Sequence, residues 1–138
     1  MADDGERAAR SGGMEGGVRG YSPLVLSHWN EMAHVSGQVG CNEDNEVPPT
    51  FRDQVFLAFA NLERVLASAD YGLRDVVKLC TYLVDRNDVL AFQEARAEVL
   101  LASHDGLAPL PASTLVVVSS LADPSWRVEI DAVAVRRR

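Results

Sequence analysis

The stretch FRDQVFLAFANLERVLASADYGLRDVVKLCTYLVD (51–85) changes its hydrophobic period halfway along. In its first half the large apolar residues recur at helical spacing, at Val55, Phe59, Leu62 and Leu66. This spacing predicts an amphipathic helix over residues 51–70. Thr50 is expected to cap its N-terminus, with Asp53 three residues on, and Gly72 marks its end.

The second half of the same stretch alternates with a period of two. Lys78, Cys80 and Tyr82 fall on one side, and Leu79, Thr81 and Leu83 fall on the other. Such alternation predicts a strand over residues 75–85. A second helix follows, with Asn87 or Asp88 as its cap and an apolar row of Phe92, Ala95 and Val99.

Two strand patterns lie on each side of this helix–strand–helix unit. YSPLVLSHW (21–29) and EMAHVSGQVG (31–40) precede it, and STLVVVSSL (113–121) and WRVEIDAVAV (126–135) follow it. The order β-β-α-β-α-β-β predicts an α+β domain over residues 21–138. Residues 1–20 are rich in glycine and charge, which predicts a flexible tail.

The strand 113–121 is apolar on both of its faces, and a strand of this kind needs cover on both sides. Two amphipathic helices cover only one face of a sheet, and the chain has no further segment for the other. We therefore expect a homo-oligomer whose sheets face each other. The alternative is a sheet face with ordinary exposed valines.

Charge and composition exclude several classes of function. The chain has 138 residues, which suits one domain, and its net charge of −7 disfavours nucleic acid and anionic membranes as partners. No apolar run is long enough to span a bilayer, and the N-terminus does not resemble a secretory signal. Two cysteines form neither a disulfide framework nor a metal motif, so a cytoplasmic location is expected.

A motif scan finds no metal, nucleotide or nucleophile signature, so neither a metal nor a cofactor is expected. His28 and His104 look like surface or loop residues, and His34 like a structural histidine in a strand. Cys80 looks like a buried apolar residue. Glu129 and Asp131 lie two apart on one strand, so both point to the same face. They form either an acid–base site or a solvated face.

From Tyr21 onward the chain resembles the RidA/YjgF family of enamine/imine deaminases. HVSGQVG (34–40) is similar to the SGQ signature of the family's second strand, and LPASTLVVVSSL (110–121) and VEIDAVAV (128–135) to its last two strands. The family's helix–strand pattern falls on Gln54, Asn61, Leu62, Leu66, Gly72, Asp75, Val77, Lys78, Tyr82, Asp85 and Asp88. The resemblance implies a chorismate-mutase-like fold, with two helices on one face of a mixed sheet and the sheets packed in a homotrimer.

The resemblance also implies a site in the clefts between trimer subunits. In the family an imine or enamine acid binds there, an arginine on the penultimate strand binds its carboxylate, and a glutamate on the last strand orients the attacking water. Glu129 stands at the glutamate position, and Ser36 and Gly37 at the cleft-lining pair. Ser113 stands where the family has its arginine, which makes this chain an atypical member.

Four further residues, Arg96, Leu24, Gln93 and Thr114, are candidates to line the cleft. Arg96 on the second helix is either a substitute for the missing arginine or a solvated helix residue. Leu24 and Gln93 fall at cleft positions, and Ser113 with Thr114 are candidates to bind a neutral carbonyl or amide. With Leu24 and Ser113 at these positions, we expect the cleft of this chain to be more apolar than that of typical family members. This predicts a substrate other than simple 2-imino acids.

Two functions of different classes follow. The first is a hydrolase acting on an imine, an enamine or a related C–N bond, with Glu129 as the catalytic base. The second is a non-catalytic trimer that binds a small metabolite in its clefts. A ribonuclease, an activity attached to this family by name, is disfavoured by the acidic charge and by the absence of a catalytic histidine pair.

Overall fold

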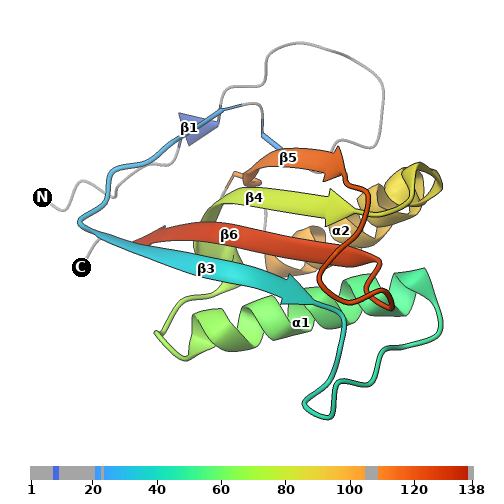
Figure 1. Ribbon diagram of the computed structural model, residues 1–138. Coiled ribbons are helices and arrows are strands. Elements are labelled where there is room, and N and C mark those ends of the chain that lie inside the picture. Colours follow the sequence, from blue (N-terminus) through green and yellow to red (C-terminus); the bar gives the residue numbers. More distant parts are fainter. Residues whose placement is uncertain (1–7, 10–20, 23, 105–108, 137–138) are drawn as a thin grey trace, which may run out of the picture.

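The computed structural model describes residues 8–9, 21–22, 24–104 and 109–136. Its main sheet has four strands in the order β3-β6-β4-β5 (Figure 1). Their bounds are Glu31–Val39 for β3, Val76–Leu83 for β4, Ala112–Val117 for β5 and Val128–Arg136 for β6. Strand β5 runs parallel to β4, and β6 runs antiparallel to both β3 and β4, so the sheet is mixed.

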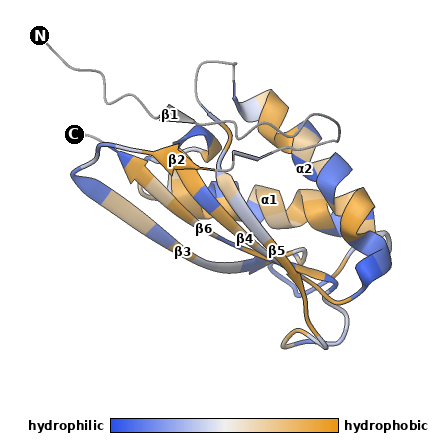
Figure 2. Cartoon of the chain, turned by 90° about the horizontal axis from the view of Figure 1, so that it is seen from above, coloured by the Kyte–Doolittle hydropathy of each residue, from blue (hydrophilic) through white to orange (hydrophobic). Residues whose placement is uncertain are grey.

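Two helices, α1 (Phe51–Ala67) and α2 (Val89–Ser103), cover one face of this sheet. Figure 2, which looks along the layers, shows both helices on the same side of the strands. Short 3₁₀ turns, η1 (Leu73–Asp75) and η2 (Arg86–Asp88), precede β4 and α2. None of the helices within the described ranges is long and apolar enough to cross a membrane.

The core lies between the helices and the sheet. All four residues of the predicted apolar row of α1, Val55, Phe59, Leu62 and Leu66, are at most 1% exposed. The predicted cap is confirmed, because the backbone N–H of Asp53 donates to Oγ1 of Thr50 at 3.1 Å. Burial of this apolar face is what holds α1 to the sheet.

The start of α2 differs from the predicted capping. Asp88 occupies the N-cap position, but its side chain makes no capping hydrogen bond. Its two carboxylate oxygens instead accept from Nη2 of Arg127, each at 2.8 Å. The carboxylate thus fixes the segment before β6 against the start of α2, because an ionised partner makes a stronger hydrogen bond than a backbone amide.

The alternation of β4 is confirmed. Leu79, Thr81 and Leu83 are buried beneath the helices, and Lys78, Cys80 and Tyr82 are only half-buried on the other face. The prediction that Cys80 belongs to the core is therefore wrong. Its apolar character suggested burial, but the pleat of the strand places it on the face that the helices leave open.

The segment 21–29 differs most from the structure that its apolar pattern predicts. Among the described residues of this segment (21–22 and 24–29) only Val25–Leu26 form a strand, β2, which pairs with β1 (Ala8–Ala9) outside the main sheet. Its neighbours Leu24 and Trp29 are 44% and 47% exposed, so the apolar side chains of this segment gain no buried face. Apart from Ala8–Ala9, the predicted tail lies outside the described residues.

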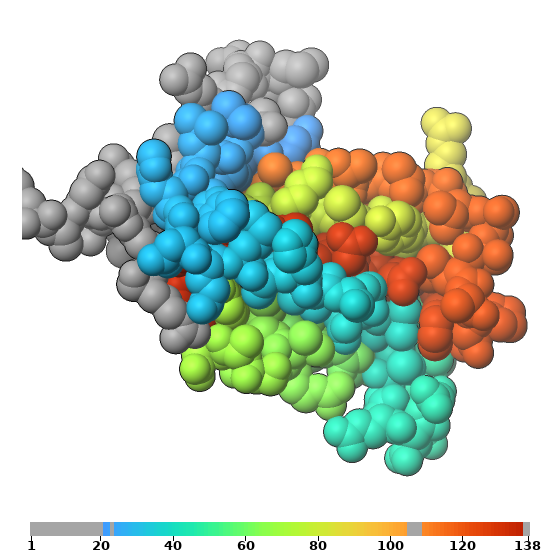
Figure 3. Space-filling view, turned by 60° about the vertical axis from the view of Figure 1, so that its left-hand side comes forward, coloured from blue at the N-terminus to red at the C-terminus, as the bar shows by residue number. Residues whose placement is uncertain are grey.

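The face of the sheet opposite the helices, called the open face here, carries both polar and apolar side chains. Figure 3 shows β3, β6, β4 and β5 side by side across it. Thr114 and Val116 on β5 are exposed there, and the pairing of β4 with β6 adds Tyr82 opposite Glu129 and Cys80 opposite Asp131. The prediction that two helices cover only one face is confirmed.

Candidate functional site

Glu129 projects from β6 onto the open face, where Gly37 of β3 makes room for it. A Cβ atom added to Gly37 would lie 2.5 Å from Oε1 and 2.7 Å from Cδ of Glu129. Real side chains do not approach so closely, so only glycine allows the carboxylate to take this position. The two residues predicted from the resemblance are thus in contact, and Ser36 is exposed beside them.

Changing Gly37 to alanine is expected to displace the Glu129 carboxylate. Because the clash is with a flexible side chain, we expect the free energy of unfolding to fall by only about 1 kcal/mol. Activity that needs a placed carboxylate is expected to fall about tenfold or more. Gly72→Ala is the matched control, since a Cβ there would approach no atom closer than 3.8 Å. Equal activity of the two variants would contradict the placement.

The end of β3, which carries Gly37, is attached to α1 by a buried asparagine. Nδ2 of Asn61 donates to the carbonyl oxygen of Val39 at 2.8 Å and to that of Cys41 at 2.9 Å. Between them lies Gly40, whose Cα packs directly on the backbone of Gln54. These contacts fix the strand end, and with it the position of Gly37.

Asn61→Ala is expected to lower the free energy of unfolding by about 2 kcal/mol, because it leaves two carbonyl groups without their donor. The measurement is urea unfolding followed by circular dichroism. Asn87→Ala, at an exposed asparagine, is the control and is expected to change stability by less than about 0.5 kcal/mol. An Asn61→Ala variant as stable as the control would show that the two hydrogen bonds do not hold the strand end.

The other ionisable groups near Glu129 on the open face are engaged with one another. The hydroxyl of Tyr82 donates to Oδ2 of Asp131 at 2.9 Å, and this hydrogen bond raises the pKa of Tyr82. Burial, and then Asp131, raise the pKa of Cys80, so its thiol stays protonated at neutral pH. Nζ of Lys78 donates to Oγ1 of Thr114 at 2.6 Å. Neither Tyr82 nor Cys80 is therefore activated as a base or nucleophile.

Arg96 lies elsewhere in the protein, between α2 and the helix-facing side of β5. It is only 2% exposed, and its Nη1 donates to Oγ of Ser113 at 3.1 Å. The interpretation of Arg96 as a solvated helix residue is therefore wrong, and the sequence analysis missed how deeply it is buried. Its neighbour Ala95 belongs to the apolar row, and Arg96 extends this row toward β5.

The candidate residues consequently divide into two groups on opposite faces of the sheet. Ser113 pairs with Leu79, which faces the helices, whereas Glu129 pairs with Tyr82, which faces the open side. Thr114 follows Ser113 and faces the open side as well. The prediction that Ser113 and Thr114 bind one carbonyl together is wrong within one protomer, because successive residues of a strand point to opposite faces. Leu24 is exposed and Gln93 half-buried.

The histidines do not contribute to either group. His34 is exposed on β3, and His28 is exposed in the segment before it. His104 is 6% exposed, and its Nδ1 lies 3.0 Å from the carbonyl oxygen of Leu100. His104, predicted to be a surface or loop residue, follows the last residue of α2 outside the helices and strands, but it is buried against the last turn of α2 and is not a surface residue. Within the described ranges no three His, Cys, Asp or Glu residues gather as a metal site.

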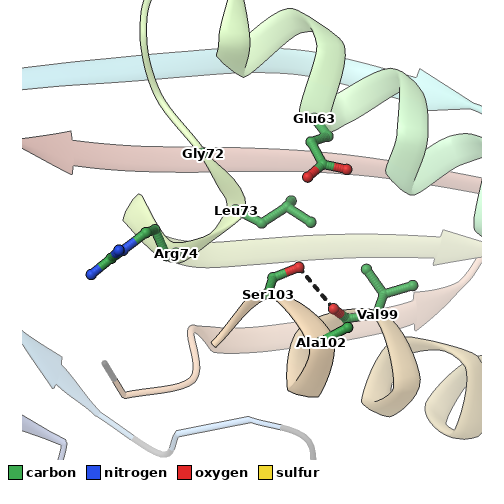
Figure 4. A pocket seen from close by; sticks show the side chains of 7 residues that line it. All are labelled: Glu63, Gly72, Leu73, Arg74, Val99, Ala102 and Ser103. Atoms are coloured by element: carbon green, nitrogen blue, oxygen red, sulfur yellow. Dashed lines mark hydrogen bonds between the residues drawn. The ribbon is translucent and has the colours of Figure 1, made fainter. Parts of the chain in front are cut away.

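A cavity of about 460 Å³ lies between the ends of the helices. Figure 4 shows its lining, with Glu63 of α1 facing Val99, Ala102 and Ser103 of α2. The hydroxyl of Ser103 is held by the carbonyl oxygen of Val99 at 2.8 Å. None of the predicted site residues lines this cavity, and it brings no acid–base pair together with a nucleophile.

Comparison with known proteins identifies the family. A family model described as Endoribonuclease L-PSP matches residues 16–136. The chain therefore belongs to the Endoribonuclease L-PSP, or RidA/YjgF, family. The chain is 32% identical to the RutC family protein YjgH of Escherichia coli over 111 residues, which are 80% of this chain and 79% of that protein.

Another RidA/YjgF relative carries an activity in its name. The protein named 2-iminobutanoate/2-iminopropanoate deaminase from Dermatophagoides farinae is 32% identical over 104 residues, 74% of this chain and 76% of that protein. A relative from Schizosaccharomyces pombe, 33% identical over 101 residues (72% of this chain and 75% of that protein), is named protein mmf2, mitochondrial.

Solved structures of RidA/YjgF proteins confirm the fold. The Rid family protein YyfB of Yersinia pestis superimposes with a TM-score of 0.80 at 27% identity, covering 95% of this chain and 98% of that one. The YjgF gene product of Escherichia coli gives a TM-score of 0.68 at 31% identity, with 78% and 83% covered. The predicted chorismate-mutase-like α+β fold, with two helices on one face of a mixed sheet, is therefore confirmed.

Proposed function

We propose that this protein is a hydrolase that cleaves an imine, an enamine or a related C–N bond in clefts between the subunits of a homotrimer. The observation that carries the proposal is the Glu129 carboxylate, held on the open face by the bare Cα of Gly37. The name of the Dermatophagoides farinae relative, a deaminase of 2-imino acids, supports the same chemistry.

Glu129 acts as general base in this proposal. A protonated imine carbon is already electrophilic, so a placed water and a proton acceptor are sufficient. The Glu129 carboxylate takes a proton from the water while the water oxygen forms a bond to the imine carbon. The proton then passes to the nitrogen of the resulting carbinolamine. The C–N bond breaks and ammonia leaves with its electron pair, while the Glu129 carboxylate takes the hydroxyl proton as the C=O double bond forms. The carbonyl compound remains, and that proton is released with the ammonia as ammonium.

The division of the candidate residues supports a site shared by two subunits. Glu129, Gly37 and Thr114 belong to the open face, and Ser113 belongs to the helix-facing side of β5. Because the sheet separates the two groups within one protomer, a single small substrate reaches both only if different copies supply them. An uncovered sheet face with exposed Val116 suits contact with such a copy.

The proposed substrate is a small molecule other than the simplest 2-imino acids, because Ser113 replaces a strand arginine. Ser36, Leu24 and Gln93 are proposed to line the remaining cleft. We also propose a cytoplasmic location, which the two free cysteines support. A ribonuclease activity, which the description of the family model names, is not proposed, because a net charge of −7 opposes binding to a phosphate backbone.

The proposal is tested by generating a panel of imino acids with an amino-acid oxidase and following the release of keto acid. Wild-type protein is expected to accelerate release for at least one substrate, and Ser113→Arg is expected to shift activity toward the smallest imino acids. Sedimentation velocity is expected to show a trimer. Stabilisation of the wild type by a metabolite without any turnover would favour the alternative, a non-catalytic trimer that binds small metabolites.

A further inference from the structure

The cavity between α1, η1 and α2 has the size and the lining of a small-molecule site. Its volume of about 460 Å³ lies within the range of about 300–1,000 Å³ that is usual for such sites. Leu73, only 3% exposed, forms an apolar wall together with Val99 and Ala102. Glu63 and Ser103 lie on either side of Leu73 in Figure 4 and add polar groups to the lining. A mostly apolar lining with a few polar groups is typical of sites that bind organic molecules.

Glu63 brings to this cavity a carboxylate that pairs with no described residue. The two arginines of its own helix are engaged elsewhere. Nη2 of Arg52 lies 2.7 Å from Oε2 of Glu98. Nη1 of Arg64 lies 3.1 Å from Oε1 of Glu43. Within the described residues no ion pair and no side-chain hydrogen bond involves Glu63. An unpaired carboxylate at the wall of a cavity favours a cation as the occupant.

The last turn of α2 adds to the negative potential of the cavity. Ala102 and Ser103 belong to this turn, whose terminal carbonyl groups carry a partial negative charge. The turn holds no basic residue that would offset this charge. The hydroxyl of Ser103 donates to the carbonyl oxygen of Val99 at 2.8 Å, so its oxygen is left as an acceptor. Arg74 also lines the cavity, but its guanidinium points away from it in Figure 4.

We propose that this cavity is a second small-molecule site, separate from the reaction cleft, and that it binds a primary alkylammonium ion. The ammonium group pairs with the Glu63 carboxylate, and the alkyl chain lies against Leu73, Val99 and Ala102. A cation without an alkyl chain leaves the apolar wall uncovered, and a neutral molecule leaves Glu63 unpaired. An anion is opposed by Glu63 and by the end of α2.

The proposed amine site lies in the helix layer, whereas Glu129 projects from the open face on the other side of the sheet. A trimer that packs through its open faces leaves its helix layers outward, so each subunit keeps its own amine site accessible. The inference therefore does not rest on the proposed hydrolysis. Amine binding by a protein without imine hydrolysis would leave the inference in place, and hydrolysis without amine binding would remove only the inference.

The test is a titration of the full chain with 3-methylbutylamine at neutral pH, followed by the NMR chemical shifts of its methyl groups. The methyl groups of Leu73 and Val99 are expected to shift until the site is saturated. 3-Methylbutan-1-ol has the same carbon chain without the charge, and it is expected to bind about fivefold more weakly, because it makes no ion pair. Ammonium chloride has the charge without the chain and is expected to give no saturable shift.

Glu63→Gln is expected to weaken binding of the amine about fivefold and to leave the affinity for the alcohol unchanged. Glu94→Gln is the matched control, because Glu94 is exposed on α2 and does not line the cavity. It is expected to bind the amine as the wild type does. Ala102→Phe, at an exposed position, places a ring in the cavity and is expected to abolish binding while the circular dichroism spectrum is unchanged.

Three results would overturn the inference. The first is the absence of a saturable shift of Leu73 and Val99 in the wild type. The second is equal affinity of the wild type for the amine and the alcohol, which would indicate an apolar depression without selection for charge. The third is equal affinity of Glu63→Gln and Glu94→Gln for the amine, or undiminished binding by Ala102→Phe.

Discussion

Glu129→Gln is expected to reduce imine hydrolysis at least about 100-fold, the range that a positioned general base contributes. Glutamine keeps the shape of the side chain and its contact with Gly37 but accepts no proton from water. Glu129 is half-buried on a strand face that the helices do not cover, so the change is not expected to alter the melting temperature by more than a few degrees.

The matched control is Asp131→Asn, two residues along the same face. The asparagine oxygen still accepts the hydrogen bond that the Tyr82 hydroxyl gives to Asp131, so the fold and the face are preserved. Activity within about threefold of wild type is expected for this variant. If both variants lose the same activity, the open face contributes only its negative charge to the reaction. If Glu129→Gln keeps full activity, Glu129 takes no part in imine hydrolysis.

Gly40→Ala is expected to have the largest effect on stability, lowering the free energy of unfolding by about 3 kcal/mol. A Cβ atom on Gly40 would lie 2.7 Å from Cα of Gln54, and it would meet the backbone of α1 and not a movable side chain. The helix and the end of β3 must therefore separate to accommodate one methyl group.

The measurement is the urea midpoint, compared with Gly72→Ala, where the nearest atom to an added Cβ is 3.8 Å away. The control is expected to shift stability by less than about 1 kcal/mol. Equal midpoints of the two variants would contradict the close approach of β3 and α1.

Local periodicity predicted the elements that build the core. Helical spacing predicted the buried row of α1 from Val55 to Leu66, and this row is confirmed. The two-residue period of a strand predicted the alternating burial of β4, which is confirmed as well. The segment 21–29 was less predictable, because its apolar residues suggested a strand without showing whether a sheet edge was free to receive it. The pairing of β2 with Ala8–Ala9 is a non-local contact that no pattern in the segment indicates.

The candidate site was predictable where the resemblance matched single positions. Glu129 and Gly37 are in contact as the matched motifs imply. Arg96 was harder, because a charged residue on an amphipathic helix usually faces water. Its burial follows from tertiary packing, since it lies beside the apolar row of α2 and beneath the small side chain of Ser113. Burial of this kind depends on the neighbouring strand and not on the helix sequence.

The most direct test of the central proposal is whether imine hydrolysis requires assembly of the subunits. Val116→Glu places a charge on the exposed apolar part of the open face, where a second copy is proposed to pack, and leaves Glu129 unchanged. The variant is expected to sediment as a folded monomer and to hydrolyse imines at least about 100-fold more slowly than the wild-type trimer, because its clefts are incomplete. A monomeric Val116→Glu variant that keeps the wild-type rate would contradict a site shared between two copies of the chain.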